Sequence, residues 1–409
     1  MATYDLTAPE LSSVLKTDGV NPTTINSILN FLKSEGDFSG SPGTVTVQDG
    51  GYPPLVGQPQ MVIVDTPSAV TFDTSADPNL QVVVDLDANV TLTGSNSVEV
   101  VVGDATNTVD LTGSSGNDIV LAGNGANTIS GGSGMDSIYA GDGAKDSLTA
   151  GTGSFQFLQA GDGNFDTLIG GSGAWDTLVA GDGMSDSLSA GSGSHQALTV
   201  GDGNFDSLVG GSGAWDTLTA GDGASDSLSA GSGSHQALTA GDGNFDSLVG
   251  GSGAWDSLTA GDGAADHLKA GSGSHQLIQA GDGDNDTLVG GSGAWDTLTA
   301  GDGSNDLLRA GKGSHQLLQA GNGNGDTLVA GSGGGDTLQS GAGSDLFKVG
   351  SVGDDTVIGG GGNDTLEFTD YASSDVATKQ VSGGVTTLTF TDGQKVSYSG
   401  ITTIKFDHH

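Results

Sequence analysis

A ten-residue repeat constrains this chain more than any other feature of its sequence. Residues 141–340 divide into twenty units that read, with few exceptions, G-x-G-x-x-[D/Q]-x-L-x-[A/G/S]. The eighth position is Leu in every unit but one, where it is Ile278. A glycine turn followed by a very short strand, repeated at a fixed period, predicts a solenoid in which each unit stacks on its neighbours and position 8 points inward.

Two kinds of unit alternate along the repeat. One kind begins with GDG and the other with GSG, with Thr152 and Lys312 as exceptions in the second kind. A coil of two units places every GDG turn on one edge of the solenoid, the first edge, and every GSG turn on the opposite edge, the second edge. A coil of three units would mix the two kinds. We therefore predict an all-β fold, a parallel β-helix or β-roll with two short strands in each coil of two units.

Composition narrows the function. The 409 residues include 75 glycines without the period of collagen, and 50 acidic residues against 10 basic ones, a net charge of -40. This charge argues against a nucleic-acid partner and favours cations. The chain has no cysteine for disulfides and no apolar run long enough for membrane insertion. Its first residues lack the basic and apolar segments of a cleaved secretion signal, so we expect export by another route.

Carboxylates gather on the first edge. Position 6 is Asp in all ten of its units, and position 2 is Asp in nine. Stacked at strand spacing these charges repel one another unless cations bind them, and oxygen donors suit Ca²⁺. The alternative is that Asp at position 6 only caps turn amides. The candidate calcium ligands of the first edge are Asp142, Asp146, Asp162, Asp166, Asp182, Asp186, Asp202, Asp206, Asp222, Asp226, Asp242, Asp246, Asp262, Asp266, Asp282, Asp286, Asp302, Asp306 and Asp326.

The second edge has a different chemistry. Its position 6 alternates between Gln and Asp, which leaves five carboxylates. Its position 5 carries an aromatic strip that begins at Phe155 and continues through Trp175, His195, Trp215, His235, Trp255, His275, Trp295 and His315. Three interpretations stay open for this strip: mutual stacking that stabilises the turns, a surface that binds glycans or a partner, and metal binding by the histidines.

The two flat faces carry small, mostly uncharged side chains, as in Ser187 with Ser189 and Thr217 with Thr219. Neutral faces on so acidic a chain favour association between copies, or ice binding by rows of hydroxyl groups.

Motifs on either side of the decapeptides resemble a known family. Residues Gly131–Asp136 read GGSGMD and residues Gly359–Asp364 read GGGGND, with looser versions at Gly113–Asp118 and Gly341–Asp345. They resemble the repeats-in-toxin (RTX) nonapeptide G-G-x-G-x-D-x-U-x, and the resemblance extends over about 113–368. It implies a calcium-loaded parallel β-roll, with Asp118, Asp136, Asp345 and Asp364 as further ligands, and type I export to the extracellular space by an uncleaved C-terminal signal. The decapeptide turn is one residue longer than the family's.

Outside the decapeptides we predict five segments. Residues 1–36 form a helical cap, because Ile25, Ile28 and Leu32 recur at helical spacing, and the cap either covers the first coil or docks to another copy. Residues 37–60 are a linker, 61–140 form irregular β coils and nonapeptides, 341–368 form further nonapeptide-like repeats, and 369–409 form a C-terminal β cap with the secretion signal.

The sequence offers no catalytic constellation, since its seven histidines form no metal-ligand pair such as HExxH. We therefore expect a non-enzymatic, calcium-binding structural protein of the bacterial surface or extracellular matrix that self-associates into a homo-oligomer or filament. The alternatives are a carbohydrate-binding adhesin that uses the aromatic strip on surface glycans, and an ice-binding protein.

Overall fold

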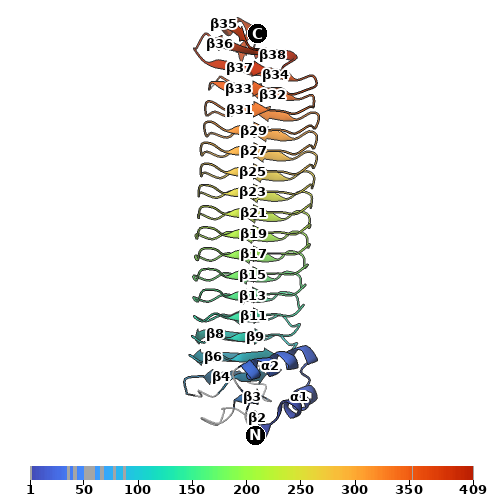
Figure 1. The fold of residues 1–409 in the computed structure, drawn as a ribbon, viewed down its shortest axis with the longest axis vertical. Coiled ribbons are helices and arrows are strands. Elements are labelled where there is room, and N and C mark those ends of the chain that lie inside the picture. The colour runs from blue at the N-terminus through green and yellow to red at the C-terminus, as the bar shows by residue number, and fades with distance from the viewer. Residues whose placement is uncertain are drawn as a thin grey trace. The chain divides into compact units, whose positions relative to one another are not determined.

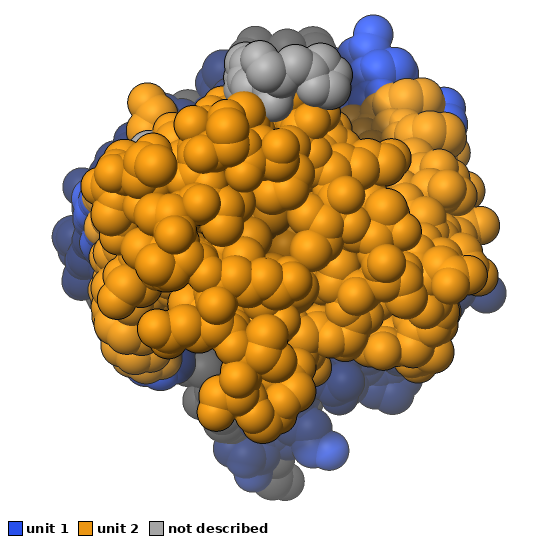
Figure 2. Space-filling view, turned by 90° about the horizontal axis from the view of Figure 1, so that it is seen from above, with its two compact units in different colours: residues 1–200 blue, residues 201–409 orange. Residues whose placement is uncertain are grey.

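The computed structural model describes residues 2–34, 37–39, 44–49, 60–64, 69–76, 80–85, 89–351 and 353–408. The chain forms two compact units, residues 1–200 and residues 201–409, which Figure 2 colours blue and orange. The division falls inside the decapeptide segment.

Unit 1 contains two helices, α1 (Ala8–Thr17) and α2 (Pro22–Ser34), and a series of short strands. The strands are β1 (Ala2–Leu6), β2 (Val45–Asp49), β3 (Met61–Val64), β4 (Val70–Asp73), β5 (Val82–Asp85), β6 (Val90–Gly94), β7 (Glu99–Val102), β8 (Thr108–Ser114), β9 (Ile119–Leu121), β10 (Thr128–Ser130), β11 (Ser137–Tyr139), β12 (Ser147–Thr149), β13 (Phe157–Gln159), β14 (Thr167–Ile169), β15 (Thr177–Val179), β16 (Ser187–Ser189) and β17 (Ala197–Thr199).

Two parallel sheets build the solenoid of unit 1, and each coil adds one strand to each sheet (Figure 1). Strands two apart in the chain pair in register, so that Leu148 of β12 lies beside Leu168 of β14, and Leu158 of β13 lies beside Leu178 of β15. These leucines are fully buried, whereas the residues on either side of each one are partly exposed. The two-strand coil and the inward position 8 are therefore confirmed.

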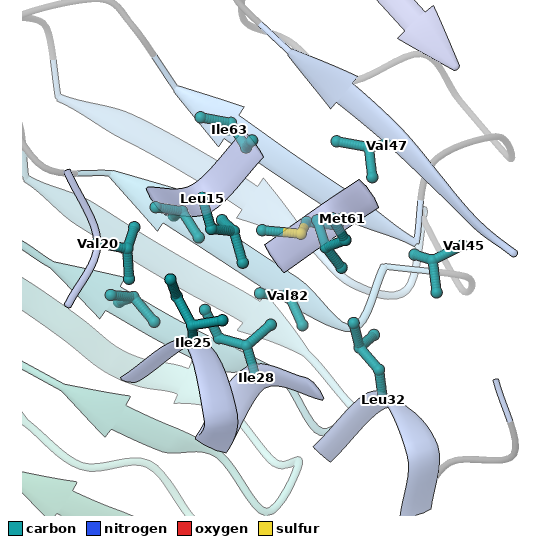
Figure 3. Close-up of a cluster of buried hydrophobic side chains, with 13 residues drawn as sticks. Leu15, Val20, Ile25, Ile28, Leu32, Val45, Val47, Met61, Ile63 and Val82 are labelled. Atoms are coloured by element: carbon teal, nitrogen blue, oxygen red, sulfur yellow. The ribbon is translucent and has the colours of Figure 1, made fainter. Parts of the chain in front are cut away.

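The first strands of unit 1 are covered on both faces. Strands β3, β5 and β7 are buried at all four positions, which explains why they read as continuous apolar runs rather than alternating ones. One set of alternate residues, including Met61, Ile63 and Val82, packs against Ile28 and Leu32 of α2 (Figure 3). The other set faces the interior of the coils.

The helices of the N-terminal segment cover the first strands of the solenoid. They pack on the outer face of β2, β3, β5 and β7. A capping box holds the start of α1, where the backbone N–H of Thr7 donates to Glu10 Oε2 at 2.9 Å. The segment predicted as a helical cap also contains β1, which pairs antiparallel with β2 inside the segment predicted as a linker. Residues 40–43 and 50–59 of that linker lie outside the described residues.

Unit 2 continues the same construction with the strands β18 (Ser207–Val209), β19 (Thr217–Thr219), β20 (Ser227–Ser229), β21 (Ala237–Thr239), β22 (Ser247–Val249), β23 (Ser257–Thr259), β24 (His267–Lys269), β25 (Leu277–Gln279), β26 (Thr287–Val289), β27 (Thr297–Thr299), β28 (Leu307–Arg309), β29 (Leu317–Gln319), β30 (Thr327–Val329), β31 (Thr337–Gln339), β32 (Leu346–Val349), β33 (Asp355–Ile358), β34 (Thr365–Ala372), β35 (Val376–Ser382), β36 (Val385–Phe390), β37 (Lys395–Ser399) and β38 (Thr403–His408). A 3₁₀ turn at Ser373–Asp375 follows β34.

The last strands of unit 2 change the pairing pattern. Strand β37 adds to β33 in parallel and then pairs antiparallel with β36, which pairs with β35, while β38 adds to β34 in parallel. Aromatic side chains fill the interior here, with the rings of Tyr371 and Phe390 stacked at 3.8 Å and those of Phe368 and Phe406 at 5.0 Å. Large rings replace the thin Leu and Ala layer of the decapeptides.

Candidate metal centre

The position-6 aspartates of the first edge, here called the inner file, point into the solenoid. No more than 1 % of any of them is exposed from Asp146 to Asp326. Within each unit, one carboxylate oxygen has a fixed partner, because Oδ1 accepts the backbone N–H of the preceding position-6 residue. The N–H of Asp246 donates to Asp266 Oδ1 and that of Asp266 to Asp286 Oδ1, both at 2.9 Å. Within each unit, these hydrogen bonds thus link the inner-file aspartates of successive coils into a continuous ladder.

The second oxygen of these carboxylates has no donor. Oδ2 is buried and has no hydrogen-bond partner in the inner-file residues Asp166, Asp226, Asp246, Asp266, Asp286, Asp306 and Asp326, nor in Asp364, which extends the file. A buried carboxylate oxygen without a donor is costly unless a cation or a proton neutralises it. This set of orphaned oxygens is the strongest sign of a ligand site in the described part of the chain.

In two earlier coils, a neutral Asn side chain occupies the position that Asp occupies in the inner file. Asn127 occupies the first-edge position one coil before Asp146, and its Nδ2 donates to the carbonyl oxygens of Gly123 and Gly125 at 2.9 and 2.8 Å. Asn107 makes the equivalent bonds one coil earlier. From Asp146 onward a carboxylate oxygen replaces that amide nitrogen. Two kinds of acceptor, the carboxylate oxygen and the turn carbonyl oxygens, then face each other without a donor between them. The turn therefore needs a positive group that the inner file does not contain.

Glycine at position 3 keeps this space open. A Cβ on Gly183 would lie 1.6 Å from the carbonyl oxygen of Gly163 in the preceding coil and 3.1 Å from Asp186 Oδ2. Any side chain here would collide with the backbone. Carboxylate and carbonyl oxygens therefore border the same small volume, and such hard donors are the ones that Ca²⁺ prefers.

Within the decapeptides, the polar groups of the second edge form hydrogen bonds with one another. Gln276 Nε2 donates to the carbonyl oxygens of Gly251 and Gly253 at 3.4 and 3.1 Å, and to Asp256 Oδ2 at 3.3 Å. Asp256 Oδ2 also accepts the N–H of Gly251, and its Oδ1 accepts that of Gln236. The amide nitrogen of Gln fills the oxygen-lined space that the inner file leaves empty of donors. The strict alternation of Gln and Asp was the sequence signal for this network. Because the prediction for this edge considered only the carboxylates, it did not include the Gln side chains as donors.

The position-2 aspartates, here called the outer file, are separate from the inner file. They are exposed, and each Oδ1 accepts the backbone N–H of the next residue in the file, as Asp222 does from Asp242 at 3.1 Å. The nineteen carboxylates expected to share one edge thus form two files, and only the inner file has orphaned buried oxygens. No group of three or more His, Asp or Glu side chains converges within the described residues. A cation at the inner file would therefore depend on backbone carbonyls as well.

Burial raises the pKa values of the inner file. Burial, with the neighbouring charges of Asp266 and Asp306, raises the pKa of Asp286 to about 7. Burial together with Asp206 and Asp246 raises that of Asp226 to about 7, and burial raises that of Asp306 to about 6. These carboxyl groups lose their protons reluctantly in the folded chain, because burial and neighbouring carboxylates both disfavour the charged form.

The nonapeptide aspartates also lie in turns. Asp345 and Asp364 continue the inner file, with the N–H of Asp345 donating to Asp364 Oδ1 at 3.0 Å. Asp118 and Asp136 lie on the second edge, where Asp136 accepts N–H groups from Asp118 and Gly132. Sequence reasoning missed Asp355, a buried second-edge carboxyl whose pKa burial and Asp336 raise to about 7.

The extra residue of the decapeptide turn is position 5, and it shapes the aromatic strip. Position 5 adopts a left-handed φ between 59° and 69° in every decapeptide from Lys145 to His315. The side chains emerge in stacked pairs: the rings of Trp215 and His235 lie 4.1 Å apart, and those of Trp255 and His275 lie 4.3 Å apart. The indoles stay about half exposed, at 52 % for Trp215. This pairing supports mutual stacking of the turns.

Comparison with known proteins agrees with this geometry at both ends of the decapeptides. A family model described as the RTX calcium-binding nonapeptide repeat matches in four copies, over residues 112–144, 321–351 and 349–368. These repeats and the parallel β-solenoid fit an RTX β-roll protein. Its cofactor is calcium. The matches leave the decapeptides between 144 and 321 uncovered, so the family resemblance expected over 113–368 is shown only at its ends.

No curated protein and no solved structure matches the chain. RTX repeat proteins are typically secreted. None of the helices among the described residues has the length and apolar character needed to span a membrane.

Acid should substitute for calcium in folding the RTX β-roll. The pKa values of about 6 to 7 at Asp226, Asp266 and Asp286 lie above the ordinary 3.8 of an aspartate, so the folded chain binds more protons than the unfolded chain between these values. Stability of the calcium-free chain should therefore be highest near the acidic end of this window and fall as pH rises toward 7. Urea unfolding in chelator at several pH values measures this slope. A calcium-free stability that rises with pH over the same window would contradict it.

Proposed function

We propose that this chain is a secreted structural protein of the bacterial surface or extracellular matrix, which folds when its inner file binds calcium and then self-associates. The observation that carries the proposal is the row of buried Oδ2 atoms without donors. A chain with such an interior resists folding where calcium is scarce and folds where it is plentiful. Export as an unfolded chain followed by folding outside the cell is consistent with that property.

Calcium would be held by the inner-file carboxylates together with carbonyl oxygens of the glycine turns. When bound, it would neutralise the oxygen atoms of the turn, to which Asn127 donates hydrogen bonds in its own turn through a neutral amide. The second edge needs no such charge, because its Gln residues donate to the corresponding oxygens. The proposal therefore places calcium along one edge of the decapeptides, while the other edge folds through hydrogen bonds alone.

Self-association has a structural basis in the open strand edges of unit 2. Within the described residues, β35 pairs only with β36 and β38 pairs only with β34. An unpaired strand edge is a template for another chain. The exposed face of β35 includes Val381, which is 67 % exposed. We place the contact between successive copies at this end of unit 2.

A Val381→Lys variant tests this contact. Because Val381 is exposed, the change should leave folding in calcium intact, and a lysine on an edge strand opposes strand addition. Light scattering should show particle size rising with calcium for the unchanged chain and not for the variant. Met184→Lys, which adds the same charge at an exposed turn residue of unit 1, is the matched control and should behave like the unchanged chain. Equal growth of both variants would refute the placement of the contact.

A further inference from the structure

A concentration of positive charge in unit 2 is unexpected in a chain with a net charge of -40. Only ten residues of the chain are basic, and four of them, Lys269, Arg309, Lys312 and Lys348, lie along one corner of unit 2. Among the described residues, Lys348 pairs with Glu367 at 3.4 Å, whereas the other three make no ion pair within the chain. Lys269, Arg309 and Lys312 are exposed. Their charges are available to a partner.

These cations follow the register of one sheet. Lys269 lies beside Val289, Val289 beside Arg309, Arg309 beside Val329, and Val329 beside Lys348. Charges and valines thus alternate from strand to strand. Since neighbouring strands are about 4.8 Å apart, the cations recur every ~9.6 Å.

This row of alternating basic and valine side chains borders an open groove, here called the cationic groove. It has a volume of about 760 Å³ and is lined by Lys269, Arg309 and Lys312 together with Val249, Val289 and Val329. The corresponding corner of unit 1 forms a smaller groove of about 410 Å³, lined by residues such as Thr149, Thr152 and Ser172 and by no charged side chain. The groove is therefore a property of the repeat, whereas its charge is specific to this part of unit 2.

The outer file has the complementary shape and charge. Its exposed carboxylates, including Asp242, Asp262 and Asp282, project from successive turns as a ridge with one charge per coil, or every ~4.8 Å. The cations of the groove recur at twice this distance. Because one coil rise sets both spacings, a ridge laid along the groove brings every second carboxylate to a cation without adjustment of either surface.

We propose that the cationic groove receives the outer file of a second copy of this chain, as a lateral contact between self-associating molecules. Arg309 and Lys269 pair with alternate carboxylates of the ridge, and the valines between them pack against its turns. Each exposed ion pair is weak, and a row of pairs in register gains strength through multivalency when several copies align. This inference rests on the proposed self-association and adds the lateral surface to it.

Charge-swapped variants of the whole chain, loaded with calcium, test the contact by sedimentation velocity. The groove variant is Lys269→Glu with Arg309→Glu, and the ridge variant is Asp242→Lys with Asp262→Lys and Asp282→Lys. Each variant alone should self-associate at least about tenfold more weakly than the unchanged chain, because two or more ion pairs become repulsive. An equimolar mixture should associate again, because opposite charges then meet at the contact. A mixture that stays dissociated, or single variants that associate normally, would overturn the proposal.

A milder pair of variants guards against failure to fold. Asp242→Asn with Asp262→Asn and Asp282→Asn keeps the Oδ1 acceptor, as Asn322 does naturally in the same file, where it accepts the N–H of Ala342. Lys269→Val with Arg309→Val copies the neighbouring Val289 and Val329. Both should weaken lateral association in the same direction. Loss of binding to a polyuronate by the valine variant, with self-association unchanged, would assign the groove to an anionic polymer and refute the contact between copies.

Failure of the lateral contact can be distinguished from failure of the end contact at β35. If only the lateral contact fails, electron microscopy should show single filaments of unchanged length for the groove variant. If only the end contact fails, the chain should still sediment as lateral assemblies larger than a monomer, which the groove substitutions convert to a monomer. The Val381→Lys chain is the reference for the second case.

Discussion

In excess chelator at neutral pH, the chain should lose most of its β signal in far-ultraviolet circular dichroism, and millimolar calcium should restore it cooperatively. The physical reason is the inner file, in which successive carboxylates such as Asp246, Asp266 and Asp286 are buried with one oxygen unpartnered. With pKa values raised to about 7 at Asp226 and Asp286, the charged file opposes folding at neutral pH unless a cation neutralises it.

Magnesium at the same concentration is the matched control for this experiment. It should restore little of the signal, because Mg²⁺ demands a near-octahedral shell and gives up its waters reluctantly. The inner file offers carboxylates and backbone carbonyls in turns whose spacing the stacked strands fix. A spectrum that does not change on chelation would show that the file folds without any bound cation.

Replacing Asp226, Asp246 and Asp266 by Asn should stabilise the calcium-free chain, whereas the native carboxylates destabilise it. This is the second large effect that we expect. In the calcium-free chain the triple variant should be more stable than the unchanged one, because each new Nδ2 can donate to turn carbonyls as Asn127 does. The same variant should bind fewer calcium ions, because three carboxylates have been removed from the file. Urea unfolding in chelator measures the first change, and calorimetric titration with calcium measures the second.

The second edge provides the control for this triple variant. Asp256→Asn and Asp296→Asn replace Oδ2 acceptors that receive N–H groups from glycine and Gln side chains, so each should destabilise the chain by about 1–3 kcal/mol. Calcium stoichiometry should fall less than in the first-edge variant. Equal losses of bound calcium from both edges would show that the two edges bind alike, and would remove the distinction drawn between them.

Local repetition made much of the fold predictable. The leucine at every eighth position and the alternation of GDG and GSG turns predicted the two-strand coil, because equivalent residues two units apart must stack in a solenoid. The cap was less predictable. Helical spacing in Ile25, Ile28 and Leu32 indicated α2, but β1 pairs with β2 across about forty residues, and no local pattern specifies such a partner.

The candidate site divides in the same way between sequence and structure. By itself the sequence determined which residues recur, that aspartates gather on the first edge, and that calcium is their natural ligand, because composition and period are properties of the chain alone. Only the tertiary structure decided that the inner file is buried while the outer file is exposed, that Gln side chains complete the second edge, and that Lys269 and Arg309 line one groove. Burial, unpartnered acceptor oxygens and shared surfaces depend on which coils stack, and stacking brings together residues that lie twenty or more positions apart in the chain.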